Sequence, residues 1–495
     1  MQVNDSFVKF KVDTGAAVTA LPASLMEKIG LEVRPSQKML RGAGNQNLVT
    51  KGEATVELRV KGKRVYETVY LVENLVTPLL GKPAIAKLKL IEFTDAISVD
   101  SWKSRFPELF TGLGTMKSAV KIKLKADHVP FAQAVPRRVA AARREPLRKE
   151  LKRMEAMGVI EKIETPTEWC SPCIVVPKKN DSIRVCIDFT KLNKAITREY
   201  HPLPTTEETL SQLGAASHFT KLDANSGYWQ LRLDESAYHL TTFITPFGRY
   251  FCKRLPFGIC SAPEIYQREM QKALVGLEGV TCQMDDILIY GCSQEEHDIR
   301  VEMVLKKLSE AGITLNPDKC EFDQNEVKFL GHVINKDGIH ADPEKTKAIR
   351  DFGIPKDRKG LRRFFGMVNY LGKFTATLAQ DSSSLRLLLH QDSDWIWSTQ
   401  QNNEFEYLKD KLSHAPTLIP YQLDKEVLLS TDASSYGLGA VILQQVDGDW
   451  RPVAFASRAL TSAESRYAQI EKEALAICWA CDKFHYYLAG RKFRV

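Results

Sequence analysis

Three aspartates stand beside apolar runs that could bring their carboxylates together. Asp285 and Asp286 lie between two short apolar runs, which predicts a β-hairpin with the acidic pair at its tip. Asp223 closes a second predicted strand, Phe219–Leu222. Converging carboxylates repel one another unless cations separate them, and two divalent ions held in this way support phosphoryl transfer. An acidic pair in a turn is more often only solvated, so the context of the aspartates must decide.

The pattern of apolar residues predicts an α+β mixture around these aspartates. Two strands, Cys173–Val176 and Ile183–Ile187, are joined by a lysine-rich turn, and a further strand is expected at Gln230–Leu233. Residues 1–93 have the short strands and turns of an all-β domain, and a new strand-rich unit begins near Val427. Helices are predicted at Pro146–Gly158, Glu207–Leu213, Ala262–Val275, Glu295–Ala311, Lys345–Phe352, Arg358–Leu378 and Asn402–Leu412.

Length and composition indicate several globular domains. The chain has 495 residues, more than one ordinary domain, and its 44% hydrophobic and 26% charged residues are typical of globular proteins. It has no uninterrupted apolar run of roughly 18 residues, and its first residues lack a secretory signal. We therefore expect an intracellular, cytoplasmic protein that has no membrane role and is not secreted.

Two other clusters allow competing interpretations. The pairs Cys170/Cys173 and Cys478/Cys481 have zinc-ligand spacing but no nearby histidine, so reduced, buried thiols are favoured. The net charge of +8 is concentrated in the arginines and lysines between Arg137 and Arg153. This cluster could follow a phosphate backbone or form a solvated helix face. The sequence alone favours the solvated face.

Three motifs around the aspartates occur in the order and spacing of a known family. They are LDANSGYWQ at Leu222–Gln230, LPFGICSAP at Leu255–Pro263 and MDDILIY at Met284–Tyr290. Together they closely resemble the reverse transcriptases of gypsy-type LTR retrotransposons. The resemblance covers nearly the whole chain, which looks like a fragment of a Pol polyprotein with protease, reverse transcriptase and ribonuclease H segments.

This resemblance implies a multidomain α+β chain with a right-hand polymerase of fingers, palm and thumb. Asp223, Asp285 and Asp286 would bind two Mg²⁺ ions, with Mn²⁺ as a substitute. The partners would be an RNA or DNA template-primer and deoxynucleotides. The implied domains are residues 1–93 (all-β acid protease), 94–126 (linker), 127–340 (fingers and palm), 341–420 (thumb and connection) and 421–495 (α/β ribonuclease H-like).

The resemblance also assigns residues to the incoming nucleotide. Tyr228 would exclude a 2′-hydroxyl as a steric gate, and Phe257 would flank the nucleotide. Lys179 and Arg184 would clamp the triphosphate, for which a bidentate arginine is well suited. Lys319 matches a family position proposed to protonate pyrophosphate.

Two further segments resemble the family's primer-handling elements. Phe329–His332 resembles the primer-grip hairpin, and Leu361–Phe374 resembles the thumb helix. Gln283 departs from the family pattern, which usually has an aromatic residue two places before the acidic pair. We expect this change to affect primer positioning and not metal binding.

The N-terminal segment resembles a retropepsin. Asp13-Thr14-Gly15-Ala16 matches its active-site loop, Pro78–Gly81 matches its later apolar-glycine signature, and Arg41–Asn45 would be the flap. Aspartic proteases need two carboxylates that share a proton, so a single Asp13 predicts a homodimer. Because few residues precede Asp13, we expect protease activity to be weakened or absent.

The C-terminal segment resembles a retroelement ribonuclease H. Asp432 on a predicted strand and Glu473 on a predicted helix match two metal-binding carboxylates. The family's next acidic ligand would follow Val495, so we expect a recognisable but inactive domain.

The most favoured function is therefore an RNA-directed DNA polymerase of a retrotransposon, present in the cytoplasm or in retroelement particles. A catalytically silent nucleic-acid-binding remnant is one alternative, and Gln283 favours it. A protein that is mainly an aspartic endopeptidase is the other. The intact set of Asp223, Asp285, Asp286 and Tyr228 favours the polymerase.

Overall fold

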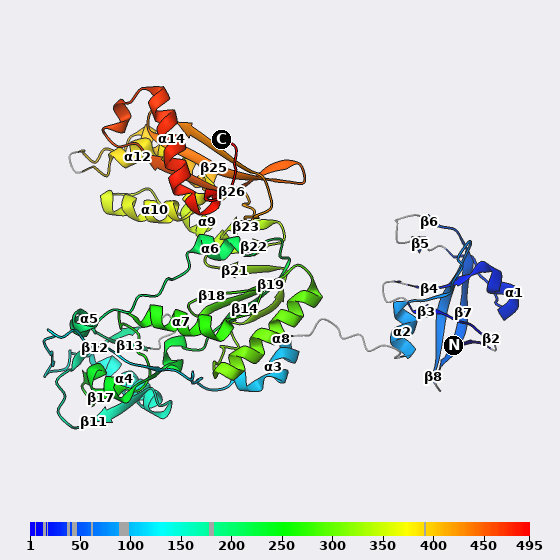
Figure 1. Ribbon diagram of the computed structural model, residues 1–495, viewed down its shortest axis with the longest axis horizontal. Helices are drawn as coiled ribbons and strands as arrows, with labels where there is room; N and C mark the ends of the chain where they lie inside the picture. Colours follow the sequence, from blue (N-terminus) through cyan, green and yellow to red (C-terminus); the bar gives the residue numbers. More distant parts are fainter. Residues whose placement is uncertain are drawn as a thin grey trace. The chain divides into compact units, whose positions relative to one another are not determined.

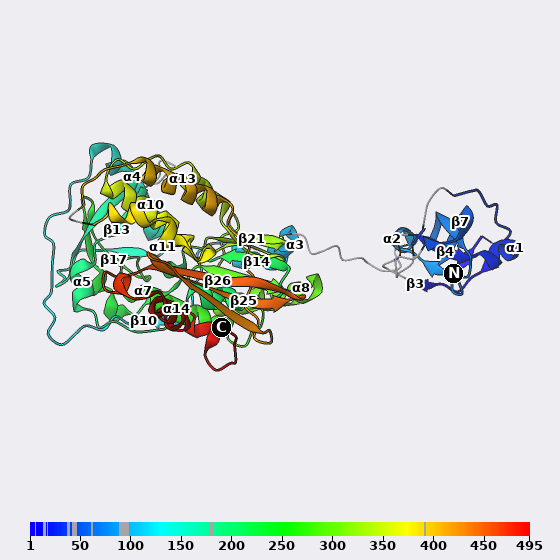
Figure 2. The same ribbon diagram turned by 90° about the horizontal axis from the view of Figure 1, so that it is seen from above.

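The computed structural model describes residues 1–4, 6–12, 16, 18–36, 40–41, 47–60, 63–88, 99–177, 183–390 and 393–495. The chain divides into two compact units, Met1–Ile97 and Ser98–Val495 (Figures 1 and 2). Across the described residues, no helix is both long and apolar enough to cross a bilayer. The domain limits expected inside the second unit stay predictions.

The first unit is mostly β structure. Its main sheet has the order β2-β1-β7-β8-β4-β9-β3, and β7 alternates between exposed residues and buried Ala54, Val56 and Leu58. Two short helices, α1 (Met26–Ile29) and α2 (Lys82–Leu88), add to the predicted strands. The strands are β1 (Gln2–Val3), β2 (Ser6–Phe7), β3 (Lys11–Val12), β4 (Thr19–Pro22), β5 (Leu40–Arg41), β6 (Asn47–Leu48), β7 (Thr50–Val60), β8 (Lys63–Val72) and β9 (Leu79–Leu80).

A four-stranded antiparallel sheet, β18-β19-β14-β20, lies at the centre of the second unit. We call it the palm sheet, after the palm predicted for this region. Two helices, α7 and α8, pack against it (Figure 1). The Ser293 hydroxyl caps α8 by accepting a hydrogen bond from the Glu296 amide, and Gly312 ends the helix in a left-handed conformation. The observed bounds of the predicted strands and helices agree with the predicted ones to within two residues. The bounds are β14 (His218–Asp223), β18 (Val280–Gln283), β19 (Asp286–Gly291), β20 (Glu321–Gln324), α7 (Ala262–Leu274) and α8 (Gln294–Ala311).

The region predicted to form the fingers has a five-stranded sheet of order β11-β17-β16-β12-β13. The predicted hairpin is confirmed as β12 (Ser171–Pro177) and β13 (Ile183–Ile187). Helix α4 (Ala141–Ala156) begins well before the predicted start at Pro146, because strong helix formers precede the proline. The other elements here are β11 (Ile160–Ile163), β16 (Phe243–Thr245), β17 (Gly248–Cys252) and α5 (Thr190–Ala195). Helix α6 (Thr206–Ser211) contacts β18 of the central sheet instead.

The strand predicted at Gln230–Leu233 is wrong at its start. Gln230 ends the 3₁₀ helix η3 (Gly227–Gln230), and only β15 (Arg232–Leu233) is extended. The buried Gln230 side chain donates to the carbonyl of Thr314 at 2.9 Å and accepts from the Thr314 amide at 2.8 Å. Thr314 is distant in the sequence, and its bonds hold Gln230 in place. The alternation of apolar residues along a strand cannot reveal such a contact.

Most of the predicted linker, residues 94–126, falls in the second compact unit, which begins at Ser98. Trp102 and Leu109 are each only 1% exposed, and the amide of Thr115 donates to the Gly312 carbonyl at 2.7 Å. The elements are α3 (Val99–Arg105), η2 (Pro107–Phe110) and β10 (Ala119–Val120), which pairs with β15. The tryptophan and the other apolar residues make this segment a support for the palm.

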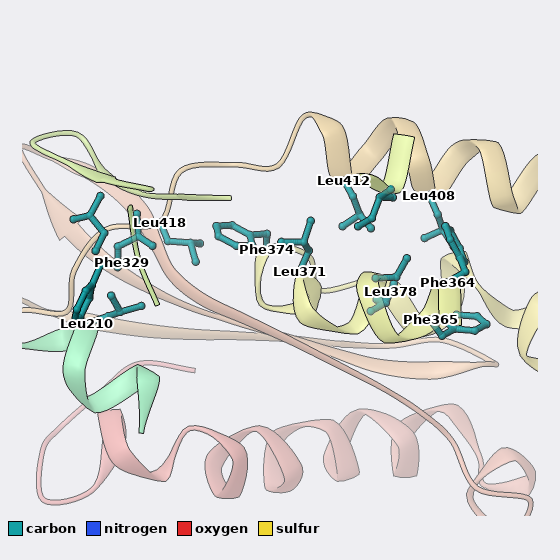
Figure 3. Packing of buried hydrophobic residues seen from close by; sticks show 14 of the residues in the cluster. Leu210, Phe329, Phe364, Phe365, Leu371, Phe374, Leu378, Leu408, Leu412 and Leu418 are labelled. Carbon is teal, nitrogen blue, oxygen red and sulfur yellow. The ribbon is translucent and has the colours of Figure 1, made fainter. Parts of the chain in front are cut away.

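One hydrophobic cluster joins the palm, the thumb and the segment that follows the thumb (Figure 3). The helix predicted at Arg358–Leu378 stops at Tyr370, because Leu371, Phe374 and Leu378 all enter this cluster and the chain must fold back to bury them. The elements are α9 (Pro343–Arg350), α10 (Arg358–Tyr370), η6 (Gly372–Phe374), α11 (Leu378–Asp381), α12 (Ser383–Leu387) and α13 (Thr399–Ser413).

The predicted primer-grip hairpin is β21 (Glu326–Phe329) and β22 (His332–Asn335), with β23 (Gly338–Ala341) beside it. Its turn residues, Leu330 and Gly331, both have positive φ, as two-residue hairpin turns favour. The Tyr370 hydroxyl of α10 donates to the Leu330 carbonyl at 2.8 Å. The thumb helix is therefore tied to the hairpin turn.

The C-terminal part has an antiparallel sheet of β24 (Val427–Ala433), β25 (Gly437–Val446) and β26 (Asp449–Ala459), with helices α14 (Gln469–Lys483) and α15 (His485–Leu488). The segment at α11 packs closely on this sheet. A Cβ at Gly439 would lie 2.6 Å from the Ala376 carbonyl oxygen, and one at Gly437 would lie 2.6 Å from the Ala379 Cβ. Both positions need glycine for this contact.

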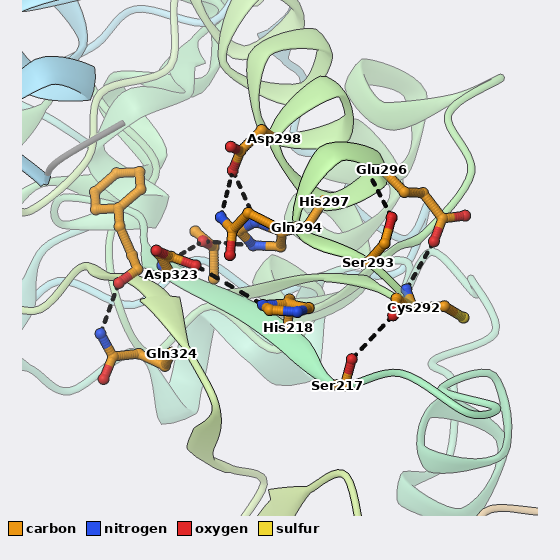
Figure 4. A network of polar contacts seen from close by, with 12 residues as sticks. Ser217, His218, Cys292, Ser293, Gln294, Glu296, His297, Asp298, Asp323 and Gln324 are labelled. Carbon is orange, nitrogen blue, oxygen red and sulfur yellow. Dashed lines mark hydrogen bonds and ion pairs between the residues drawn. The ribbon is translucent and has the colours of Figure 1, made fainter. Parts of the chain in front are cut away.

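A polar network links α8 to the helix side of the palm sheet (Figure 4). Thr220 on β14 bonds the buried His297 ring at 2.9 Å, and its hydroxyl accepts from the Asp323 amide at 3.1 Å. Asp298 lies 3.2 Å from the other ring nitrogen. Burial lowers the pKa of His297, so the ring is neutral near pH 7 and bonds without a buried charge.

We predict that Phe364→Ala destabilises the second unit by about 3–5 kcal/mol, because a fully buried ring in the shared cluster would be replaced by a cavity. Urea unfolding followed by tryptophan fluorescence measures the change. Leu387→Ala is the matched control, since Leu387 is 59% exposed, and should change stability by no more than about 0.5 kcal/mol. Equal midpoints for the two variants would contradict the assignment of the core.

Candidate active site

The pairing of β14 with β19 brings the predicted carboxylates together. Asp223 and Asp286 are directly opposite in the antiparallel register, and opposed residues project from the same face of a sheet. Asp285 lies in the β18–β19 turn, where its carbonyl accepts a hydrogen bond from the Ala224 amide at 2.9 Å. Strand pairing thus places all three aspartates at one end of the palm sheet.

A buried glutamine on α7 holds the turn that carries Asp285. The Gln267 side chain is 0% exposed; it donates to the Cys282 carbonyl at 2.8 Å and accepts from the Met284 amide at 2.7 Å. Met284 has a φ of 58°, a strained value for a residue with a side chain. Gln267 supplies the bonds that keep this conformation.

Asp285 has the most perturbed carboxyl group of the three. Burial, and next the nearby charge of Asp223, raise its pKa to about 6. The nearby Tyr266 hydroxyl opposes this rise in pKa, but the buried Oδ1 atom makes no hydrogen bond of ordinary geometry among the described residues. A buried carboxylate oxygen without a partner is costly, and a bound cation would remove that cost.

Two lysines hold the other carboxylates. Lys319 Nζ lies 3.0 Å from Asp223 Oδ2, and Lys221 Nζ lies 3.5 Å from Asp286 Oδ1. With these pairs in place, no three acidic, cysteine or histidine side chains in the described ranges are arranged to hold one metal ion. Three carboxylates facing two ammonium groups still suit hard divalent cations, which prefer carboxylate oxygens, once a cation replaces Lys319.

The predicted gate residue lies beside the aspartates. Tyr228 packs on Phe257 with ring centroids 4.8 Å apart and meets Tyr266 edge-on at 5.3 Å. Burial and the Asp285 charge raise the pKa of Tyr228 to about 12. The preceding Gly227 allows this approach, since a Cβ there would lie 2.0 Å from Asp285 Oδ1. Phe257 is 52% exposed and therefore accessible to a ligand.

Three other predicted site residues are Arg184, Lys179 and Gln283. Arg184 is exposed on β13, opposite Val176, and has no contact with the aspartates among the described residues. Lys179 lies outside the described residues. Gln283 pairs with Asp286 across the hairpin, and its Oε1 is buried without a partner among the described residues.

The two C-terminal carboxylates lie close to one strand end. Asp432 is on β24, opposite Gly439. Gln469 on α14 donates both to the Ala433 carbonyl at 2.6 Å and to Glu473 Oε1 at 2.9 Å. This amide links the helix that carries Glu473 to the strand that carries Asp432. Thr377 and Gln380 line the same cavity as Asp432.

The predicted protease site is only partly described. Asp13, Thr14 and Gly15 lie outside the described residues, as does most of the predicted flap. The second signature is described: the Gly81 amide donates to the buried Thr19 hydroxyl at 3.2 Å. A Cβ at Gly81 would lie 2.3 Å from the Val18 carbonyl oxygen, so glycine is required there. The catalytic assignment of Asp13 stays a prediction.

Sequence reasoning did not identify Gln267, Tyr266 or Lys221 as parts of the site. Gln267 and Tyr266 belong to α7, whose buried residues include both apolar and polar side chains, so their types alone carry no signal. Lys221 had one usable signal, because it precedes Asp223 by two places and therefore shares its side of the strand.

A palm sheet with carboxylates at its strand ends, flanked by fingers and a thumb, defines the class of right-hand polymerases. Family models agree with this class. Residues 176–334 match reverse transcriptase (RNA-dependent DNA polymerase), residues 1–84 match aspartyl protease, and residues 397–495 match the RNase H-like domain found in reverse transcriptase. Members of the reverse transcriptase family generally use divalent metal ions.

The curated relatives that match the chain are Pol polyproteins of transposons. The retrovirus-related Pol polyprotein from transposon 297 of Drosophila melanogaster is 37% identical over 354 residues, which is 70% of this chain and 33% of that protein. The transposon Tf2-3 polyprotein of Schizosaccharomyces pombe is 36% identical over 320 residues, 64% of this chain and 24% of that protein. The chain is similar to gypsy-type Pol polyproteins and spans a third or less of the length of these relatives.

A solved structure has the same fold. The foamy viral protease-reverse transcriptase in complex with an RNA/DNA hybrid has a TM-score of 0.70 and 19% identity, and covers 99% of this chain and 69% of that chain. The predicted multidomain α+β fold, with protease, right-hand polymerase and ribonuclease H-like parts, is confirmed.

We predict that divalent-ion affinity falls as the pH is lowered from 7 to 5. Asp285 must be ionised to act as a ligand, and its pKa is raised to about 6, so affinity should fall about tenfold for each pH unit below that value. Mn²⁺ titration monitored by electron paramagnetic resonance measures this. Asp285→Asn should bind Mn²⁺ weakly and lose the step near pH 6. A flat profile for the unmodified protein would refute the role given to Asp285.

Proposed function

We propose that this chain is an RNA-directed DNA polymerase that transfers deoxynucleotides to a primer end. The observation that carries the proposal is the convergence of Asp223, Asp285 and Asp286 at one end of the palm sheet. Template-directed extension needs this carboxylate set together with a surface for nucleic acid. The foamy viral relative of similar fold was solved with an RNA/DNA hybrid, which supports an RNA or DNA template-primer as the partner.

The proposed cofactor is a pair of Mg²⁺ ions, with Mn²⁺ as a substitute. Bound there, the ions would activate the primer hydroxyl and hold the triphosphate. Asp223 and Asp285 would be the main ligands and Asp286 a further one. Gln267 keeps Asp285 in position through the turn backbone. Lys319, which pairs with Asp223, would give up that contact to a bound cation and could then supply a proton to pyrophosphate.

Tyr228 and Phe257 form the proposed deoxynucleotide pocket. Their packed rings lie next to Asp285, so the Tyr228 ring would meet the sugar of a nucleotide whose phosphates face the carboxylates. A 2′-hydroxyl would collide with the ring. Arg184, exposed on β13, would bind the triphosphate, and Lys179, which lies outside the described residues, is predicted from the sequence to do the same.

Two accessory activities are proposed for the flanking domains. Asp432 and Glu473 would supply two of the carboxylates of an RNA–DNA hybrid ribonuclease, and Gln469 bonds both Glu473 and the carbonyl of Ala433, the residue after Asp432. Asp13 would supply one carboxylate of an aspartic protease, which requires a homodimer. Analytical ultracentrifugation of the unmodified protein and of Asp13→Asn, with self-cleavage measured for both, tests the second activity.

We predict that Asp285→Asn lowers Mg²⁺-dependent extension of a DNA primer on an RNA template by at least about 10²-fold, because the substitution removes a charge that holds the cations. Filter binding of the template-primer should change by less than about threefold, since the amide keeps the size of the side chain. Asp318→Asn, an exposed aspartate nearby, is the control and should extend normally. Normal extension by Asp285→Asn would contradict the proposal.

We predict that Tyr228→Val raises the use of ribonucleotides relative to deoxynucleotides by about tenfold or more, because the ring that excludes the 2′-hydroxyl is lost. Single-nucleotide incorporation with the two sugar types measures the ratio. Tyr436→Val, at a residue that is 58% exposed in the turn between β24 and β25, is the matched control. An unchanged ratio would remove Tyr228 from the gate role.

A further inference from the structure

Lys221 lies at the boundary between the carboxylate cluster and the hydrophobic core. It shares a face of β14 with Asp223, and in the antiparallel register it is the diagonal neighbour of Asp286. Long side chains reach such diagonal partners. Its Nζ lies 3.5 Å from Asp286 Oδ1, so the sequence position of this lysine sets its contact with the metal-binding residues.

The same ammonium group also contacts the primer-grip hairpin. Lys221 Nζ donates to the Lys328 carbonyl at 3.1 Å, one residue before the end of β21 and two before the turn at Leu330. One side chain therefore touches both a carboxylate of the proposed metal site and the backbone that leads into the primer-grip turn.

The surroundings of Lys221 limit its freedom. Its side chain is 20% exposed, and its strand neighbours Phe219 and Leu288 are fully buried in the shared hydrophobic cluster. A charge next to apolar groups needs polar partners, and Asp286 and the Lys328 carbonyl provide them. The ammonium group cannot leave one partner without disturbing the other.

Lys319 gives a direct comparison. It also pairs with one of the aspartates, but its side chain is 62% exposed and can move into solvent when a cation arrives. Lys221 is held from two sides. The two lysines therefore have different tasks, although both neutralise carboxylates of the same cluster.

We propose that Lys221 is a positioning residue that fixes Asp286 and the primer-grip hairpin relative to one another. This inference rests on the proposed polymerase function. The ammonium group of Lys221 neutralises part of the negative charge of Asp286 and so weakens cation binding. The same side chain aligns the primer end with the metal site.

The test uses the full chain with Lys221→Gln and Lys221→Met. The glutamine can still donate to the Lys328 carbonyl but has no charge. Lys221→Gln therefore provides a folded, uncharged variant if Lys221→Met fails to fold. With template-primer bound and no nucleotide, Mn²⁺ titration by electron paramagnetic resonance should show about tenfold tighter binding in both variants, because a repelling charge is gone. This readout tests the charge of Lys221, and the primer end tests its positioning role.

The second readout is the primer end itself. A 2-aminopurine at the primer 3′ terminus should brighten in Lys221→Met, since the hairpin loses its link to Asp286. In the same variant kcat should fall about 10²-fold, while KM for the nucleotide changes little. Lys221→Arg should restore Mn²⁺ affinity toward that of the unmodified protein. Lys411→Met, which breaks a partly buried pair with Asp381 in the thumb, should leave Mn²⁺ affinity unchanged.

Unchanged or weaker Mn²⁺ binding in Lys221→Gln would overturn this inference. Failure of the proposed function would look different, because the unmodified protein would then extend no primer. The Mn²⁺ comparison does not depend on extension, so the two failures are distinguishable.

Discussion

The pairing register of β14 with β19 is the constraint on which the site depends. It sets Asp223 directly opposite Asp286 and leaves Asp285 in the turn, so three negative charges are concentrated where two strands end. Such a cluster is unfavourable by itself. Much of the surrounding structure compensates for it: two lysine ammonium groups neutralise part of the charge, and Gln267 holds the strained turn.

The parts of the site differ in how firmly they are held. The carboxylates lie on a sheet backed by two helices, by the Thr220–His297 contact and by the large cluster shared with the thumb. Of the two predicted triphosphate contacts, Arg184 is exposed on β13. Firm support for the proposed metal ligands and an exposed arginine for the substrate are consistent with binding a nucleotide that must enter and leave.

Much of this could be predicted from the sequence, because the relevant signals are local. The Ser293 cap and Gly312 fixed the ends of α8, and apolar alternation revealed β14 and β19. Other features depend on distant partners. Gln230 is helical because Thr314 binds its side chain, and residues from Val99 onward are ordered because Trp102 is buried in the second unit. Spacing along the chain carries no record of such contacts, and the same is true of Gln267.

The contact between α11 and the C-terminal sheet also has a consequence for how the sequence can change over time. The backbone at Ala376 and the side chain at Ala379 fill the space that side chains at Gly439 and Gly437 would need. A larger residue at either glycine would be tolerated only if the path of the 376–379 segment shifted with it. The two segments are therefore expected to diverge together, as a correlated pair of positions in two different domains.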